Sequence, residues 1–192
     1  ETLDSLTLTI SDVTPPTFIT NNLDVILDGN GLITISASDL VFSSSDNCGV
    51  DSMWLSNYDF DCSDIGQDEI FVTLSDASGN EYTQSAMVTV SDNSSPIAVT
   101  QSVTGYLNAL GEFVASASDF EAGSTDNCGI TSTTINETVF NCDNVGINTL
   151  EFILSDGSGN TTIELVELTI LDTISPTLIV EDVSLALNID GE

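Results

Sequence analysis

The sequence predicts an all-β chain built from tandem antiparallel β-sandwiches. Three observations support this fold class. One sequence unit recurs every 80 residues, apolar residues alternate with polar ones in short runs, and Asp, Ser, Gly and Asn separate these runs. Alternation with a period of two is typical of half-buried strands, and evenly spaced short strands are typical of a sandwich. We find no segment with the apolar stripe of a helix.

The repeat is marked by motifs that return without insertion or deletion. The Asp-Asn-Cys-Gly motif at 46–49 returns at 126–129, and Pro16 returns as Pro96 and Pro176. Self-similarity at a fixed period is the signature of a repeat protein. The chain therefore divides into the last strand of one repeat (1–15), two complete repeats (16–95 and 96–175) and the first strands of a following repeat (176–192). We expect a longer array.

Each repeat shows the same strand signals in the same order. Alternating runs occupy 33–37, 70–74 and 88–90, and the second repeat carries them at 113–117, 150–154 and 168–170. The segment 76–80 lies between the last two runs of the first repeat and predicts a hairpin loop, in which Gly79 supplies a positive φ.

Each repeat also holds two cysteines, 14 residues apart. Of the three possible pairings, Cys48–Cys62 with Cys128–Cys142 repeats with the sequence, so we predict these two disulfides. Each would stabilise a small unit by about 3 kcal/mol in the chain-entropy model. A zinc site is the alternative, but two thiolates without His make a poor zinc cage. Disulfides indicate an oxidising compartment, secreted or at the cell surface.

The charge of the chain excludes several functions. It has 31 acidic residues and no Lys, Arg or His, which gives a formal net charge of −31. Nucleic acid and anionic membranes would be repelled, so we expect neither as a partner, and we expect no direct membrane insertion. Catalysis that depends on His or on a Schiff-base Lys is impossible. The sequence therefore predicts a protein that is not an enzyme.

The order of motifs resembles the HYR (hyalin repeat) module. These motifs are Asp-x-x-x-Pro, Asp-Asn-Cys-Gly, Phe-x-Cys, Ser-Asp-x-Ser-Gly-Asn and a closing Val-Thr-Val-x-Asp. The resemblance implies an immunoglobulin-like, fibronectin-III-like sandwich and a role in cell adhesion. In the more usual module the second cysteine lies in the final strand, where this chain has Met87-Val88 and Glu167-Leu168.

Placing the second cysteine at Cys62 and Cys142 is similar to the tandem repeats of giant Bacteroidetes surface adhesins, which include gliding-motility adhesins exported by type IX secretion. This resemblance implies a structural and adhesive spacer rod on a bacterial cell surface. Its partners would be neighbouring repeats of the same chain and surface polysaccharide or other cell-surface components. A polysaccharide-binding module and a spacer of a secreted enzyme are the alternatives.

Acidic residues that recur in both repeats suggest calcium sites at the joints. In an immunoglobulin-like topology the linker and several loops meet at one end of the sandwich, and calcium takes six to eight oxygen ligands. We expect one site from Asp12, Asp39, Asp46, Asp76 and Asn80. The second site would comprise Asp92, Asp119, Asp126, Asp156 and Asn160. Solvated turn aspartates that hydrogen-bond their own backbone are the alternative.

Two surface features complete the candidates. Asp-Ser/Thr-apolar triplets resemble the O-glycosylation acceptor of Bacteroidetes and would place sugars on Ser5, Ser52 and Thr173. Trp54 is an aromatic that could stack on a sugar, but its counterpart in the second repeat is Thr134. We therefore predict a strand or core role for Trp54.

Overall fold

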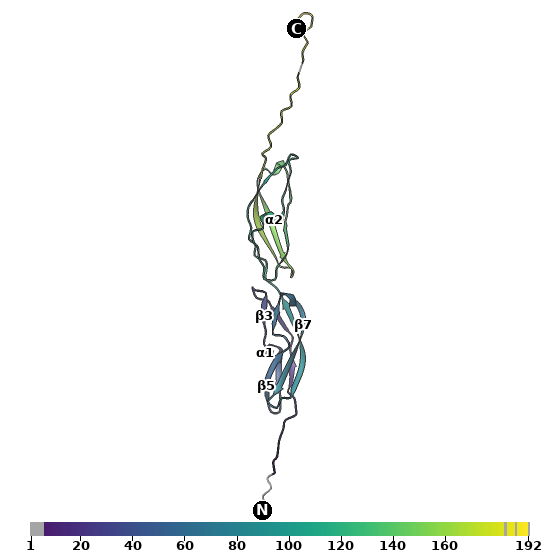
Figure 1. Ribbon diagram of the computed structural model, residues 1–192, viewed down its shortest axis with the longest axis vertical. Helices are drawn as coiled ribbons and strands as arrows, with labels where there is room; N and C mark the ends of the chain where they lie inside the picture. Colours follow the sequence, from purple (N-terminus) through teal and green to yellow (C-terminus); the bar gives the residue numbers. More distant parts are fainter. Residues whose placement is uncertain (1–5, 183, 187, 192) are drawn as a thin grey trace, which may run out of the picture.

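The computed structural model describes residues 6–182, 184–186 and 188–191. Two β-sandwiches lie end to end and form a rod with the chain termini at opposite ends (Figure 1). The predicted tandem immunoglobulin-like β-sandwich architecture is confirmed. Residues 6–16 and 172–182 have no regular secondary structure and extend along the rod axis. Residues 1–5 of the strand predicted at 1–15 lie outside the described residues.

The first repeat contains eight strands and two short helical turns. In chain order these are β1 (Thr17–Thr20), β2 (Leu23–Ile26), β3 (Leu32–Thr34), α1 (Ala37–Leu40), β4 (Val41–Ser45), β5 (Val50–Leu55), β6 (Asp59–Asp61), the 3-10 turn η1 (Cys62–Asp64), β7 (Gly66–Asp76) and β8 (Glu81–Ser91). Strands β2, β8, β7 and β5 form a sheet in that order, in which β2 runs parallel to β8. The remaining strands pair antiparallel as β1–β4 and β3–β6.

The second repeat reproduces this arrangement. Its elements are β9 (Val103–Tyr106), β10 (Phe113–Val114), α2 (Ala117–Phe120), β11 (Ile130–Ile135), β12 (Val139–Phe140), η2 (Cys142–Asn144), β13 (Gly146–Asp156) and β14 (Thr161–Leu171). The four-stranded sheet has the order β11-β13-β14-β9, and β10 pairs with β12. Two isolated bridges, Ile97 with Thr125 and Thr100 with Glu121, stand where β1 and β4 pair in the first repeat.

The core of each repeat lies between its four-stranded sheet and the opposing strand pairs. The hairpin β7–β8 supplies alternate buried residues such as Ile70, Val72 and Val88, which pack with Phe18 of β1 and Phe60 of β6. The second repeat has a separate cluster of the same kind. The strands predicted at 70–74 and 88–90, and at 150–154 and 168–170, are therefore confirmed.

The run at 33–37 is only partly a strand. Strand β3 ends at Thr34, and Ala37–Leu40 forms one helical turn, α1, with Ala37 and Leu40 buried. Ser36 donates its backbone N–H to Asp39 Oδ2 at 2.7 Å, which satisfies a free donor at the start of this turn. Strand and turn both direct apolar side chains inward, so their sequence pattern resembles one longer strand. Among the described residues, no helix is long and apolar enough to cross a bilayer.

Candidate functional site

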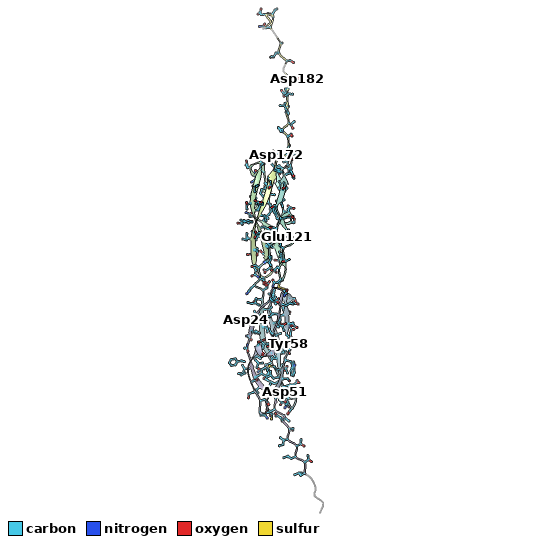
Figure 2. All side chains as sticks on the ribbon, turned by 90° about the vertical axis from the view of Figure 1, so that its left-hand side faces the viewer. Asp24, Asp51, Tyr58, Glu121, Asp172 and Asp182 are labelled. Atoms are coloured by element: carbon cyan, nitrogen blue, oxygen red, sulfur yellow. A yellow bond between two sulfur atoms is a disulfide. The ribbon has the colours of Figure 1, made fainter. Side chains whose placement is uncertain are left out.

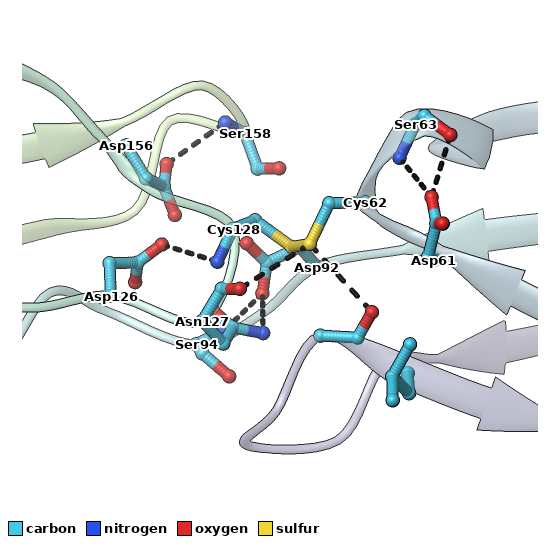
Figure 3. The surroundings of a disulfide bond; sticks show 12 residues. Asp61, Cys62, Ser63, Asp92, Ser94, Asp126, Asn127, Cys128, Asp156 and Ser158 are labelled. Atoms are coloured by element: carbon cyan, nitrogen blue, oxygen red, sulfur yellow. Dashed lines mark hydrogen bonds between the residues drawn. A yellow bond between two sulfur atoms is a disulfide. The ribbon is translucent and has the colours of Figure 1, made fainter.

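A disulfide joins the two repeats. Cys62, in η1 of the first repeat, is bonded to Cys128, in the loop before β11 of the second, with a Cα–Cα distance of 5.4 Å (Figure 3). We call the surrounding region the interdomain joint. It comprises the linker 92–96, the loop 126–128, the turn 28–31 and Cys62. The repeats are thus connected twice, by the chain itself and by this bond.

The predicted pairing of Cys48 with Cys62 and of Cys128 with Cys142 is wrong. Cys48 and Cys142 are free, exposed thiols. The six-residue strand β5 lies between Cys48 and Cys62 and covers about 20 Å, so these cysteines stand at opposite ends of one sandwich. A disulfide needs Cα atoms within about 7 Å. Pairing between neighbouring repeats also follows the 80-residue period, and it brings the two Cα atoms close enough.

Two further contacts close the joint. The side-chain amide of Asn127 donates to the backbone oxygen of Asp28 in the first repeat at 3.0 Å. The Sγ atom of Cys62 lies 3.4 Å from the backbone oxygen of Asn127. Gly31 has φ of +75°, and a Cβ there would lie 2.6 Å from Cys62 Sγ and 2.7 Å from Asn127 O. The turn 28–31 can approach the second repeat this closely only because this position is glycine.

Three aspartates gather beside the disulfide. Asp92 directly follows β8, Asp126 precedes β11, and Asp156 ends β13. Each offers a carboxylate oxygen, and these oxygens lie within 4.8 Å of one another. We call this group the joint triad. Figure 3 shows the three carboxylates on the second-repeat side of the Cys62–Cys128 bond.

Two oxygens of the joint triad have no hydrogen-bond donor among the described residues. Asp92 is 4% exposed. Its Oδ1 accepts from Ser94 N and Asn127 Nδ2, but its buried Oδ2 has no partner among the described residues. The same holds for Oδ2 of Asp126 and Oδ1 of Asn127. Buried polar atoms are normally paired, and this chain has no side-chain cation to pair with them. The arrangement is suited to a hard cation.

The third carboxylate is held by its own hairpin loop. Oδ1 of Asp156 accepts from the backbone N–H groups of Ser158, Gly159 and Asn160 at 2.7–2.9 Å, and Oδ2 accepts from Asn160 Nδ2 at 2.7 Å. Burial by itself raises the pKa of Asp156. The hydrogen bonds from Asn160, Gly159 and Ser158 outweigh it and bring the pKa below its usual value of 3.8. The loop therefore keeps this carboxylate ionised.

A matching group stands at the other end of the first repeat. Asp12, Asp46 and Asp76 form the N-terminal triad, again with ligand atoms within 4.8 Å of one another. Oδ2 of Asp12 and of Asp46 lack partners among the described residues. Hydrogen bonds from the backbone of Thr14 and the side chain of Asn47 lower the pKa of Asp12. Each residue of the N-terminal triad is equivalent to a residue of the joint triad 80 positions later.

The structure brings together six of the ten residues predicted for calcium. Asp39 and Asp119 are not among them, because each carboxylate accepts the backbone N–H of a serine at the start of a short helix. Asn80 and Asn160 adjoin the triads but present their amide N–H groups, which donate to Asp76 Oδ2 and Asp156 Oδ2 at 2.7 Å. They orient carboxylates and offer no carbonyl oxygen on that side.

Asn127 is a site residue that the sequence reasoning did not select. It stands between Asp126 and Cys128 in the repeated Asp-Asn-Cys-Gly motif. The recurrence of this motif is the sequence signal that could have identified Asn127 as a site residue. Its amide bonds both Asp92 and the first repeat.

The remaining candidates lie on the surface. Ser52 and Thr173 are exposed, whereas Ser5 lies outside the described residues. Trp54 lies on β5 and is 36% exposed, so it has the predicted strand position. Acidic side chains such as Asp24, Asp51 and Asp182 are spread along the rod (Figure 2). Glycosylation of the three hydroxyl residues stays a prediction.

No protein-family model and no curated protein matches this chain. Solved structures that match this chain include the extracellular cadherin domains 1–4 of protocadherin gamma B7, at 11% identity and a TM-score of 0.37 over 82% of this chain. This chain spans 51% of that one. Human mucin-like protocadherin EC1-2 matches at 11% identity and a TM-score of 0.42, over 82% of this chain and 98% of its own.

The fibronectin(III)-like modules of Clostridium thermocellum CbhA match at 12% identity and a TM-score of 0.30, over 87% of this chain and 100% of theirs. The immunoglobulin-like assignment of this chain rests on its strand order and on the cores described above.

Proposed function

We propose that this chain is a rod-forming segment of a large secreted adhesin, similar to the gliding-motility adhesin SprB of Bacteroidetes, and that it acts as a rigid spacer at the bacterial cell surface. The observation that carries the proposal is the interdomain joint. Two sandwiches stand end to end, and a disulfide supplements the linker between them (Figure 1). The disulfide also supports a place outside the cytosol.

The joint has the elements needed for stiffness. A single linker leaves two domains free to swing and twist about it. The Cys62–Cys128 bond adds a second covalent connection, and the hydrogen bond from Asn127 to Asp28 adds a third contact. Proline at position 96 restricts the linker itself. Motion between the repeats is thereby reduced to bending about the line that joins the two covalent connections.

We further propose that calcium completes the joint. The ligands would be the carboxylates of Asp92, Asp126 and Asp156, with Oδ1 of Asn127 as a neutral oxygen. Calcium accepts carboxylate, amide and water oxygens in a flexible geometry. A bound ion would offset the repulsion of three neighbouring carboxylates and would fix the linker through Asp92. The N-terminal triad would bind calcium in the same way.

The rigidity of the rod can be measured with the two native free thiols. Spin labels on Cys48 and Cys142 report the end-to-end distance across both repeats. With calcium we expect one narrow distance distribution. The double variant Cys62→Ser/Cys128→Ser keeps both labelling sites and should give a clearly broader distribution. Equal widths in the two proteins would show that the disulfide does not stiffen the rod, and the spacer proposal would lose its main support.

Calcium binding can be measured by thermal unfolding with the disulfide intact, in excess EDTA and then in millimolar calcium at constant ionic strength. Saturation at 100 times the dissociation constant adds about 2.7 kcal/mol to the folded state, which raises the melting temperature by several degrees. The increase in melting temperature should exceed that produced by magnesium. Asp92→Asn should remove the part of the increase that comes from the joint triad. Superimposable melts in EDTA and calcium would contradict the calcium proposal.

A further inference from the structure

We propose that the Cys62–Cys128 bond is one link in a continuous series of disulfides between repeats. In this series Cys142 bonds the Asp-Asn-Cys-Gly cysteine of a following repeat, and Cys48 bonds the second cysteine of a preceding one. The inference rests on the proposed array and adds the covalent partner of each free thiol.

The far end of the second repeat matches the first-repeat half of the interdomain joint. Cys142 Sγ lies 4.0 Å from the backbone oxygen of Gly111, and Cys62 Sγ lies 3.7 Å from that of Gly31. Both glycines have φ of +75°. The two halves differ in exposure, because Cys62 is half-buried by the next repeat and Cys142 is exposed.

An open cavity marks the place that a following loop would fill. It measures about 550 Å³ and is lined by residues that include Asn108, Gly111, Cys142, Asp172 and Pro176. At the joint, the equivalent surface of the first repeat faces the loop 126–128, and Asn127 donates to Asp28 there. The cavity therefore has the position and the lining expected of a binding site for an Asp-Asn-Cys-Gly loop.

The near end of the first repeat matches the other half of the joint. Asn47 Nδ2 donates to Asp12 Oδ1 at 3.2 Å, as Asn127 donates to Asp92 at 3.1 Å. The backbone N–H of Cys48 bonds Asp46 Oδ1 at 2.8 Å, as that of Cys128 bonds Asp126 Oδ1 at 2.9 Å. The loop thus already has the conformation that its counterpart has when bonded to a neighbour.

The linker indicates that the occupant is a repeat of the same chain. Asp172 and Pro176 follow the second repeat with the spacing of Asp92 and Pro96, and both line the cavity. A repeat that continues the chain would use this linker. A second copy would bring its own linker from Asp12 to Pro16, and two linkers would compete for one place.

Each link forms by a balanced oxidation. Two thiols lose two protons and two electrons and form one S–S bond, while a disulfide oxidant accepts them and is reduced to two thiols. Oxidised glutathione is a sufficient oxidant for the test.

The experiment uses a three-repeat protein made by joining residues 1–175 to residues 96–192, which keeps the native Ser-Pro junction. The changes S132T and V139I mark the peptides of both cysteines of the added repeat by mass. The protein is refolded in a glutathione redox buffer, its free thiols are alkylated, and it is cleaved after acidic residues without reduction. This cleavage places Cys48, Cys62, Cys128 and Cys142 on four different peptides.

We expect the first Cys142 to be linked to the marked Cys128, and Cys62 to the unmarked one. The matched variant, with C142S in the unmarked repeat alone, should lose only the former link and leave the marked Cys128 alkylated. The inference is overturned if the unmarked Cys142 bonds the unmarked Cys128 of its own repeat, is recovered alkylated, or appears only in disulfide-linked dimers. In the 192-residue chain Cys142 has no such partner, so these outcomes are independent of its calcium melts and its spin-label distances. Failure of this inference is therefore distinguishable from failure of the proposed function.

Discussion

The side chain of Asn127 donates a hydrogen bond to Oδ1 of Asp92 at 3.1 Å and a second to the backbone of Asp28 at 3.0 Å. One amide thus connects the second repeat, the linker and the first repeat, next to the disulfided Cys128. The geometry of the joint triad and the angle between the repeats therefore depend on the same side chain.

Replacing this amide should weaken both calcium binding and the joint. Asn127→Ala removes a hydrogen bond to a carboxylate, a contact worth about 1.5–3 kcal/mol, so we expect calcium affinity at the joint triad to fall about tenfold or more. Isothermal titration measures the affinity, and spin labels on Cys48 and Cys142 measure the joint. Asn47→Ala is the matched control, since it loses the bond to Asp12 but has no interdomain partner within the part of the chain that the structure describes. Equal broadening of the distances in both variants would contradict the role given to Asn127.

Two aspartates of the joint triad should respond differently to the same substitution. Asp126→Asn keeps the oxygen that accepts from Cys128 N and removes one of three neighbouring negative charges. We expect its stability in EDTA to be equal or higher, and we expect the part of the calcium-dependent increase that comes from the joint triad to be lost. Asp156→Asn places an NH₂ group against Asn160 Nδ2, so it should also lose about 1–3 kcal/mol in EDTA.

Urea unfolding with and without calcium separates these two patterns. Asp119→Asn, which lies outside the joint triad, should retain the calcium effect. A calcium effect as large in Asp126→Asn as in the native chain would show that this carboxylate is not a ligand.

The two equivalent glycines test how close the repeats are. Gly31→Ala and Gly111→Ala impose the same strain, since both positions have φ of +75°. Only at Gly31 would the added Cβ also meet the neighbouring repeat, at 2.7 Å from Asn127 O. We expect Gly31→Ala to be the more destabilising in thermal unfolding and to shift the Cys48–Cys142 distance, whereas Gly111→Ala should leave that distance unchanged. Identical behaviour would argue against tight packing at the joint.

Asp39 predicts a pH dependence that is independent of the metal. The backbone N–H and then the hydroxyl of Ser36 lower the pKa of Asp39 below 3.8. A lowered pKa in the folded state contributes stability above the unfolded-state pKa, and that contribution is lost as the pH falls through the folded-state value. The stability difference between the native chain and Asp39→Asn, measured by urea unfolding in EDTA, should therefore be constant from pH 7 to about 5 and shrink below about pH 4.

Asp24→Asn removes the same charge from an exposed position on β2 and controls for net charge. A difference between the native chain and Asp39→Asn that grows on acidification would contradict the assignment.

The sequence was sufficient to predict the repeat and its main strands because both are local properties. Ile70, Val72 and Leu74 alternate with polar residues, and one face of β7 is buried accordingly. The hairpin loop at Asp76 to Asn80 was likewise readable from its turn residues. The turn α1 was missed because Ala37 continues the alternation of Ile33 and Ile35 that a strand also produces.

The acidic sites were predictable only in part. Recurrence selected Asp92, Asp126 and Asp156 correctly as neighbours, but it also selected Asp119, which recurs because it caps a helical turn. Recurrence shows that a residue has a role in every repeat, but it does not identify that role. Which oxygens lack donors is a property of packing, and only the structure shows it.

By itself, the sequence determined the fold class, the period and the absence of any side-chain cation. Strand alternation, duplication and composition are local properties that do not depend on how the chain packs. The tertiary structure alone decided which cysteines meet. Cys48 and Cys62 are close in sequence, but β5 holds them at opposite ends of a sandwich. Cys62 and Cys128 are 66 residues apart and come within bonding distance because the two sandwiches stack end to end.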